Sequence, residues 1–220
     1  MPKGGVLQEQ VPGMVGSAAF VADGRRAVVL GLTEQLVGRR TFGATGFRYC
    51  GNLLPPRLPV DERETLLREV RDIVNCLTTT FGLQGLNGLD FVWHEGRVWT
   101  LEVNPRPTAS MELMNAAYDV RVFDAHVRAF EGQLPSFDLE RAMVSAPAAG
   151  KAVLYAPQDV VLGDTSGWAA CGLRDIPHPG ERIRKGHPVC TILVTGTTPT
   201  VCLRKLRARA TELRAVIGSQ

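Results

Sequence analysis

The chain has 220 residues, of which 45% are hydrophobic, and a formal net charge of +3 at pH 7. This composition is typical of a globular protein with room for one large core, or for a core and a small second domain. The charge is too small to indicate nucleic acid or a membrane surface as a partner, and no run approaches the roughly 20 apolar residues that span a bilayer. The five cysteines are odd in number and include no CxxC pair, which is typical of reduced, mostly buried thiols in a cytoplasmic protein.

The first part of the chain predicts short antiparallel strands. They are expected over residues 6–11, 15–22 and 25–33, and the Asp23-Gly24 pair between the last two is typical of a hairpin turn. Residues 38–59 are rich in Gly, Arg and Pro, which predicts an irregular loop holding at most one short strand.

A helix is predicted to start near Asp61. Asp61 is the expected N-cap, and Glu64 three residues later would close a capping box. Gly82 is expected to end the helix. Between these two ends, apolar residues recur at helical spacing: Leu66, Leu67, Val70, Ile73, Val74 and Leu77.

The remaining elements complete an α+β fold. In chain order we expect strands over 87–94 and 97–104, helices over 110–117 and 121–131, strands over 151–157 and 188–195, and a helix over 199–217. The pattern predicts a mainly antiparallel sheet with flanking helices over 1–131, a linker over 132–150, and a small β-rich domain over 151–220 that ends in a helix. The last helix carries five Lys and Arg side chains, which we interpret as a solvated face rather than a nucleic-acid patch.

Residues 88–107 carry the most chemical information. Trp93 and Trp99 belong to alternating apolar sets on the two predicted strands, and the sets share a buried face only if the connection is odd-membered, most simply Glu95-Gly96-Arg97. In that register Asp90 lies directly opposite Glu102, at about 4.5–5.5 Å between Cβ atoms. Asn104 follows on the same face.

Two carboxylates held this close repel each other unless a cation lies between them. Hard divalent cations take such all-oxygen ligand sets, and Mg²⁺ completes its shell with water and substrate phosphates. Arg106 follows at the same period, and its guanidinium is suited to a phosphate or acyl-phosphate oxygen. The alternative is that Asp90 and Glu102 are solvent-facing strand residues and that Asn104 to Pro107 form only a turn.

The pattern Asp90…Glu102-x-Asn104-x-Arg106 resembles the metal-binding hairpin of ATP-grasp enzymes, a superfamily that includes biotin carboxylase and many carboxylate–amine ligases. Its acidic residue precedes the E-x-N-x-R segment by 12 positions, as in that family. The segment Gln8-Glu9-Gln10-Val11-Pro12-Gly13 is similar to the strand that forms the family's nucleotide hinge. The resemblance covers residues 5–131.

The resemblance implies an ATP- and Mg²⁺-dependent (or Mn²⁺-dependent) ligase that makes an acyl phosphate from a small carboxylate, which an amine then attacks. It implies metal binding by Asp90, Glu102 and Asn104, and a catalytic Arg106 that steadies the phosphorylated intermediate. It also implies contacts with the adenosine from four hinge residues: Gln8, Glu9, Gln10 and Val11. The expected setting is coenzyme or small-metabolite biosynthesis.

The chain also departs from the family pattern. Only Met1 to Gly5 precede the hinge, so we expect the family's preceding domain and glycine-rich lid to be missing. On this basis the isolated chain should bind Mg²⁺-ATP weakly and be inactive, with an upstream half or a second copy as its partner. The rival interpretation is a non-catalytic nucleotide-binding or assembly subunit, or a remnant, that needs a partner half.

Other chemistry has weaker support. Cys171, His178, His187 and Cys190 invite a zinc interpretation, but their spacings of 7, 9 and 3 do not match paired zinc knuckles. His94 and His126 are isolated histidines. No local Ser-His-Asp or Cys-His pattern indicates nucleophilic catalysis.

Overall fold

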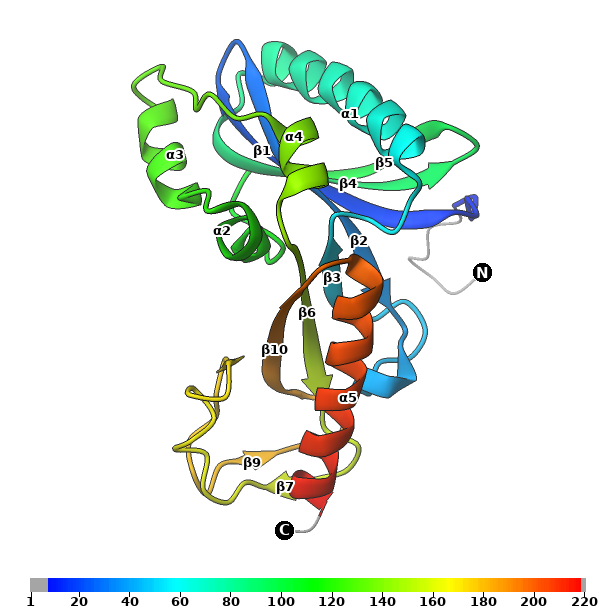
Figure 1. Cartoon of the computed structure of the whole chain (residues 1–220), viewed down its shortest axis with the longest axis vertical. Helices are drawn as coiled ribbons and strands as arrows, with labels where there is room; N and C mark the ends of the chain where they lie inside the picture. The colour runs from blue at the N-terminus through cyan, green and yellow to red at the C-terminus, as the bar shows by residue number, and fades with distance from the viewer. Residues whose placement is uncertain (1–7, 219–220) are drawn as a thin grey trace, which may run out of the picture.

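An eight-stranded antiparallel sheet organises the protein, in the strand order β5-β4-β1-β2-β3-β6-β10-β8. The structure is a computed structural model that describes residues 8–218 (Figure 1). The strands are β1 Met14–Asp23, β2 Ala27–Val37, β3 Tyr49–Leu54, β4 Gln84–His94, β5 Arg97–Asn104, β6 Ala148–Tyr155, β8 Leu173–Arg174 and β10 Pro188–Gly196. Two short strands, β7 Val160–Val161 and β9 Arg182–Ile183, form a separate ribbon.

Five α-helices accompany the sheet within the described residues. They are α1 Val60–Phe81, α2 Glu112–Tyr118, α3 Val122–Ala129, α4 Leu139–Ser145 and α5 Pro199–Gly218. The predicted α+β class with a mainly antiparallel sheet is therefore confirmed. None of the described helices is long and apolar enough to cross a membrane.

Helix α1 covers one face of the β5-β4-β1-β2 region (Figure 1). Its predicted apolar stripe supplies Leu66, Leu67, Val70 and Val74 to a core with Phe91 of β4. Gly82 ends the helix in the left-handed conformation, with φ 63°, as predicted. The N-cap prediction was wrong: the cap is Pro59 rather than Asp61, and no side chain caps this end. Asp61 lies in the first turn instead, where its charge favours the positive end of the helix dipole.

Helices α2 and α3 pack against the opposite face, where Met111 and Met114 join Leu30 and Leu86 in a second core. His126 of α3 fixes this packing, because its Nδ1 accepts a hydrogen bond of 2.9 Å from the backbone N–H of Leu86. On this face α3 lies against β4 and β1, and α2 lies against β3 and β6. The loop that connects β5 to α2 is thereby held close to the sheet.

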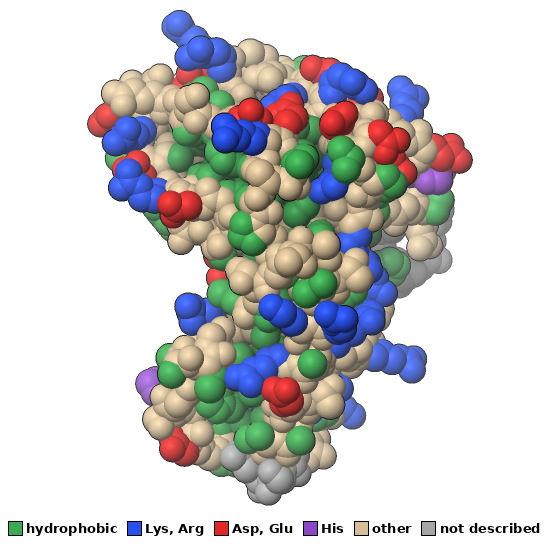
Figure 2. All heavy atoms as spheres, viewed as in Figure 1, with side chains coloured by type: hydrophobic (Ala, Val, Ile, Leu, Met, Phe, Trp, Pro, Cys, Tyr) green, Lys and Arg blue, Asp and Glu red, His purple; other side chains and the backbone are tan. Residues whose placement is uncertain are grey.

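Helix α5 packs along β6 and β10 and closes a third core (Figure 1). This core combines Leu36 and Leu53 from the first part of the chain with Leu154, Ile192 and Leu206 from the last part. On the outer side of α5, Arg204, Lys205 and Arg207 are exposed, and Lys and Arg side chains gather over this region in Figure 2.

The predicted linker over 132–150 contains regular structure. Helix α4 lies within it, capped by the Asp138 side chain, which accepts a 2.9 Å hydrogen bond from the N–H of Arg141. Glu140 of α4 is held by Arg71 of α1. The last residues of the segment already belong to β6, which pairs with β3 in the main sheet. The division into domains at 132–150 stays a prediction, and one sheet runs across it.

The predicted first strand over 6–11 is not found where it can be described. Residues 6 and 7 lie outside the described residues, and residues 8–12 have no regular secondary structure. Strand β1 begins only at Met14. Pro12 has no N–H to donate to a ladder, and Gly13 has φ 142° with its backbone against the carbonyl of Trp93, a position that leaves no room for a side chain.

Candidate metal and nucleotide site

The β4–β5 hairpin pairs Asp90 with Glu102, as predicted. Its connection, however, is a two-residue turn and not the predicted three-residue one. His94 pairs with Arg97, and Glu95 and Gly96 have φ of 49° and 74°, which is the pattern of a two-residue hairpin turn. The register then shifts between Asp90 and Phe91, so that Leu101 is an extra, bulged residue.

The two-residue turn changes the face on which Trp99 lies. Trp93 is 5% exposed and packs against α1, where its Nε1 donates a 3.1 Å hydrogen bond to Glu62. Trp99 pairs with Val92 instead and is 46% exposed. The prediction that both tryptophans share the buried face was therefore wrong, because the two-residue turn puts Trp99 on the same side of the sheet as Asp90.

The carboxylates of Asp90 and Glu102 form part of a hydrogen-bonded cluster. Asn104 donates through Nδ2 to Glu102 Oε1 at 3.0 Å, and Arg106 donates through Nη2 to Asn104 Oδ1 at 3.0 Å. Gln35 of β2 donates through Nε2 to Asp90 Oδ1 at 2.9 Å. Burial, followed by the neighbouring Glu102 carboxylate, raises the pKa of Asp90 to about 6. The site thus disfavours a second negative charge unless a cation is present.

These side chains line a cavity of about 270 Å³ whose floor is polar and uncharged. Across β1, β2 and β3, Ser17 contacts Thr33 at 3.0 Å, Asn52 donates to Thr33 at 2.9 Å, and the Tyr49 hydroxyl donates to Asn52. Ser17, Thr33 and Asn52 are buried, and burial raises the pKa of Tyr49, so that its hydroxyl stays protonated at neutral pH. A buried, hydrogen-bonded floor of this kind fixes the positions of the groups above it.

A family model for the ATP-grasp domain matches residues 1–110, which is half of the chain. The chain belongs to the ATP-grasp family. This family contains carboxylate–amine ligases and carboxylases, and its enzymes use ATP. The family that the Asp90…Glu102-x-Asn104-x-Arg106 pattern indicated is therefore confirmed.

Known proteins resemble this chain in sequence or in structure. The carbamoyl phosphate synthase large chain of Halomonas eurihalina is 25% identical over 113 residues, which cover 51% of this chain and 10% of that protein. The L-amino acid ligase of Bacillus licheniformis has a similar structure, with a TM-score of 0.69 and 14% identity over 89% of this chain and 50% of that one. The biotin carboxylase domain of Hydrogenobacter thermophilus 2-oxoglutarate carboxylase, solved with MgADP and bicarbonate, gives a TM-score of 0.64 and 14% identity over 89% of this chain and 44% of that one.

The chain therefore spans about half the length of these two solved structures and a tenth of the curated relative. At 14% identity the structural likeness shows the ATP-grasp fold alone. What the hairpin binds has to be argued from its own residues.

The donor set of the ATP-grasp hairpin fits a hard divalent cation. It offers two carboxylates and an amide oxygen, which are the oxygen ligands that Mg²⁺ takes in proteins. Within residues 8–218, no group of three or more His, Cys, Asp or Glu side chains is placed to hold a metal. Two carboxylates and one amide oxygen leave coordination positions open for phosphate and water, which Mg²⁺ commonly keeps in nucleotide sites.

Of the predicted site residues, the structure brings together Asp90, Glu102, Asn104 and Arg106. The hinge residues are placed elsewhere: Gln8, Glu9 and Gln10 are exposed, Val11 is half-buried, and none of the four lines the cavity. Their contact with a nucleotide stays a prediction.

Sequence reasoning missed the cavity floor and Gln35. The missed residues come from three strands, and their signal is visible in retrospect. Thr33, Glu34 and Gln35 interrupt the otherwise apolar strand β2 with three polar residues in succession. Asn52 similarly interrupts β3 between Gly51 and Leu53. Buried polar residues that find hydrogen-bond partners across strands are informative, because an unpaired one would be costly.

Proposed function

We propose that this chain is the metal- and nucleotide-binding half of an ATP- and Mg²⁺-dependent ligase that joins a small carboxylate to an amine. The observation that supports this most directly is the Asp90–Glu102 pair, which lies beside Asn104 and Arg106 on the wall of one cavity. Mn²⁺ would serve in place of Mg²⁺ with the same oxygen ligands.

The proposed reaction has two steps. A carboxylate oxygen of the first substrate attacks the γ-phosphorus of ATP, and ADP leaves, which gives an acyl phosphate. The amine of the second substrate then attacks the carbonyl carbon, loses a proton, and inorganic phosphate leaves. Both steps shift negative charge among phosphate oxygens, so positioning and electrostatic stabilisation supply most of the catalysis.

Asp90, Glu102 and Asn104 would hold the Mg²⁺ in this scheme. When bound with the nucleotide, the cation would neutralise the negative charge on the phosphoryl group that is transferred. Gln35 holds the Asp90 carboxylate in place through its 2.9 Å hydrogen bond. Arg106 is exposed beside the carboxylates, and its guanidinium is suited to an oxygen of the acyl phosphate.

The nucleotide has an apolar surface available next to the carboxylates. Trp99 and Leu101 are 46% and 59% exposed on β5, and Val92 pairs with Trp99 on the same side as Asp90. Large exposed apolar side chains beside a charged cluster are typical of a site that receives a ligand with a flat apolar part. We place the base of the nucleotide there, with Gln8 to Val11 closing over the adenosine.

Binding of an ATP analogue, measured by calorimetry, tests this proposal. The 220-residue chain should bind the non-hydrolysable analogue with Mg²⁺ or Mn²⁺ and lose binding in EDTA, and Asp90→Asn should lose the metal dependence. Binding that is unchanged in EDTA or in Asp90→Asn would refute the metal site. Metal-dependent binding by a protein that forms no ADP with any carboxylate and amine, even with an upstream half supplied, would favour a non-catalytic nucleotide-binding or assembly subunit.

The cellular setting is also part of the proposal. The five cysteines form no disulfide, and Cys50, Cys190 and Cys202 are buried. Burial raises the pKa of the Cys190 thiol to about 12, so this thiol stays protonated and unreactive. These features favour the cytoplasm. A preceding ATP-grasp half or a second copy is the proposed partner, because the chain spans only about half the length of the similar solved structures.

A further inference from the structure

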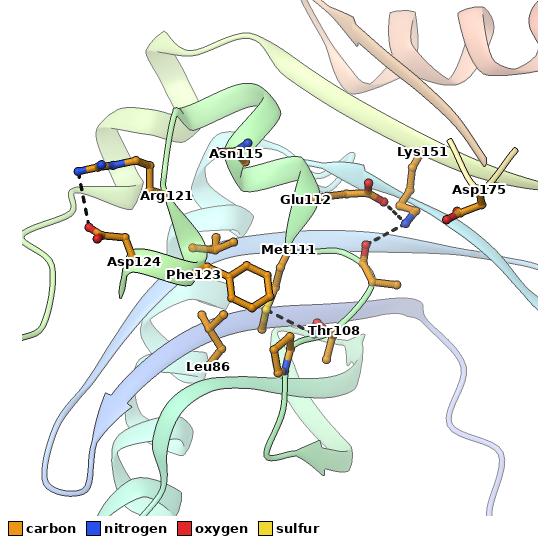
Figure 3. Close-up of a pocket in the computed structure, with 13 residues that line it drawn as sticks. Leu86, Thr108, Met111, Glu112, Asn115, Arg121, Phe123, Asp124, Lys151 and Asp175 are labelled. Atoms are coloured by element: carbon orange, nitrogen blue, oxygen red, sulfur yellow. Dashed lines mark hydrogen bonds and ion pairs between the residues drawn. The ribbon is translucent and has the colours of Figure 1, made fainter. Parts of the chain in front are cut away.

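A second cavity has a volume of about 760 Å³ (Figure 3). It adjoins the cavity of about 270 Å³ that Asp90 and Glu102 line, which we call the metal cavity. Thr108 and Ala109, in the loop between β5 and α2, line both cavities. A volume of this size lies within the roughly 300–1,000 Å³ that is usual for small-molecule sites. A molecule bound there would therefore lie one loop away from Asp90, Glu102 and Arg106.

A buried lysine forms part of the wall. The Lys151 side chain is 6% exposed, and its Nζ donates a 2.9 Å hydrogen bond to the carbonyl of Ala109 and a second one to the Glu112 carboxylate. Lys151 pairs with Asn52 in the sheet, so it connects the floor of the metal cavity with the loop that both cavities share. A buried ammonium with fixed partners makes this wall rigid and preorganised.

The end of the cavity beside Lys151 has an additional negative charge. Asp175 lies there, as Figure 3 shows, and its carboxylate accepts a 2.7 Å hydrogen bond from Thr191. Within the described residues, Asp175 forms no ion pair, whereas Glu112 already pairs with Lys151. This end is therefore suited to an ammonium group, and it is the end that lies beside Ala109 of the shared loop.

The opposite end has a guanidinium. Arg121 is 75% exposed in its side chain and approaches Asp124 at 3.6 Å, and Asp124 also forms an ion pair with Arg128 at 3.3 Å. The Asp124 carboxylate is thus shared between two arginines. Because exposed ion pairs contribute little to stability, Arg121 can exchange Asp124 for the carboxylate of a ligand at small cost.

Between the two ends, apolar side chains form a strip of the wall, with Thr108 and Asn115 beside it. Figure 3 shows Phe123, Met111 and Leu86 between Arg121 on one side and Lys151 with Asp175 on the other. Phe123, in the first turn of α3, is 67% exposed. An apolar strip bounded by opposite charges is complementary to a ligand whose ammonium and carboxylate are separated by an apolar spacer.

We propose that this cavity binds the amine substrate, and that this substrate is an ω-amino carboxylate with an apolar chain or ring between its amine and its carboxylate. Asp175 receives the ammonium beside the shared loop, Phe123 and Met111 contact the spacer, and Arg121 binds the carboxylate. The role as acceptor site rests on the ligase function proposed above, whereas binding of this class of ligand to the cavity does not require nucleotide or metal.

The test is direct binding to the 220-residue chain by calorimetry and NMR, without ATP or Mg²⁺. The probes are 4-aminobutanoate, 6-aminohexanoate, 8-aminooctanoate and 4-(aminomethyl)benzoate, with hexylamine, hexanoate and L-leucine as comparisons. At least one ω-amino carboxylate should bind tenfold or more tightly than hexylamine and hexanoate. Equal affinity for all probes, tighter binding of L-leucine, or no binding of any ω-amino carboxylate would overturn the proposal.

Matched variants locate the binding. Arg121→Gln and Asp175→Asn should each weaken the best probe at least tenfold. Arg68→Gln and Asp72→Asn, both on the exposed side of α1 and outside the cavity, should leave its affinity unchanged. Asparagine tolerates the positive φ of 51° at position 175, so this variant keeps the local backbone. Unchanged affinity in both cavity variants would place the ligand elsewhere and overturn the proposal.

A nucleotide titration of the same variants separates this inference from the proposed function. Arg121→Gln and Asp175→Asn should bind the Mg²⁺-ATP analogue as the unchanged chain does, because neither residue lines the metal cavity. If the unchanged chain binds ω-amino carboxylates but shows no metal-dependent nucleotide binding, the ligase assignment alone is refuted. Intact nucleotide binding without ω-amino carboxylate binding would refute the acceptor site alone.

Discussion

Asp90 lies opposite Glu102 because a single bulged residue, Leu101, moves Glu102 along its strand. Continued regularly from the His94–Arg97 pair, the ladder would place Leu101 opposite Asp90, since each step toward Asp90 advances the partner by one residue. The bulge gives Asp90 both Leu101 and Glu102 as neighbours. Bulges are common next to functional sites, where they change the direction of a side chain. Here the bulge places the Glu102 carboxylate beside that of Asp90, and the exposed side chain of Leu101 lies next to both.

Replacement of Glu102 with glutamine should separate a metal ligand from a structural residue. Glu102 is exposed, so Glu102→Gln should leave the free energy of unfolding within about 0.5 kcal/mol of the original. The Mg²⁺-dependent affinity for an ATP analogue should fall at least about tenfold, because a hard cation loses a charged oxygen ligand.

The matched control is Glu95→Gln, in the turn of the same hairpin, where the side chain is 84% exposed. It removes the same charge from the same element and should leave nucleotide affinity unchanged in calorimetry. Equal loss in the two variants would mean that only the net charge of the hairpin matters. Unfolding of Glu102→Gln would indicate a structural role.

The raised pKa of Asp90 predicts a pH dependence. Its folded-state pKa is about 6, against about 3.9 in an unfolded chain, so between these values the folded state holds a proton that the unfolded state has released. Without metal, the contribution of Asp90 to stability should therefore decrease as the pH rises from about 4 to about 6. Mg²⁺ affinity should increase with pH through about 6, because the cation requires the carboxylate.

Denaturant unfolding and Mg²⁺ titrations at a series of pH values measure both effects, and NMR of the Asp90 carboxyl gives its pKa directly. Glu102→Gln should lower the pKa of Asp90 toward its ordinary range, since it removes the neighbouring negative charge. An Asp90 pKa that is already ordinary in the unchanged chain would contradict the close pairing of the two carboxylates.

Leu101 predicts an apolar contribution to nucleotide binding. Leu101→Ser should reduce the affinity for the ATP analogue about tenfold, because covering an exposed leucine side chain with the base should contribute about 1.5 kcal/mol. The free energy of unfolding should change little, since Leu101 is already 59% exposed. Val144→Ser is the control: Val144 is 72% exposed on α4 and lines no part of the metal cavity. The same affinity in both variants would rule out a nucleotide base over β5.

The Lys151–Glu112 pair predicts an asymmetric effect on stability. Glu112→Gln should cost about 3 kcal/mol, because it leaves the buried Lys151 ammonium without a counter-ion. Lys151→Met should cost about 1 kcal/mol, since Met fills a similar volume and Glu112, whose side chain is 38% exposed, can be hydrated. Urea unfolding of both single variants and of the double variant measures this. A larger loss in Lys151→Met than in Glu112→Gln would contradict the difference in burial.

The sequence by itself determined helix α1 and the pairing of the two hairpin carboxylates. The apolar periodicity of residues 66–77 and Gly82 defined α1, because helical spacing and a left-handed stop are local properties. The alternation in residues 88–104 and the Asp90…Glu102-x-Asn104-x-Arg106 spacing predicted a carboxylate pair on one face, since side chains alternate along a strand whatever surrounds it. The ATP-grasp family followed from the same residues.

Only the tertiary structure decided the rest. The turn and the bulge each shift the strand register by one residue. The two shifts cancel at Asp90, which lies beyond the bulge, but not at Trp99, which lies between the turn and the bulge. The alternation of apolar residues fixes only one register for the whole hairpin, so it could not predict both outcomes. Gln35, Asn52 and Lys151 reach the two cavities from strands far apart in the sequence, because pairing of β3 with β6 brings residue 52 opposite residue 151. Such contacts depend on which strands become neighbours, and strand order is set by the packing of three cores rather than by any local pattern.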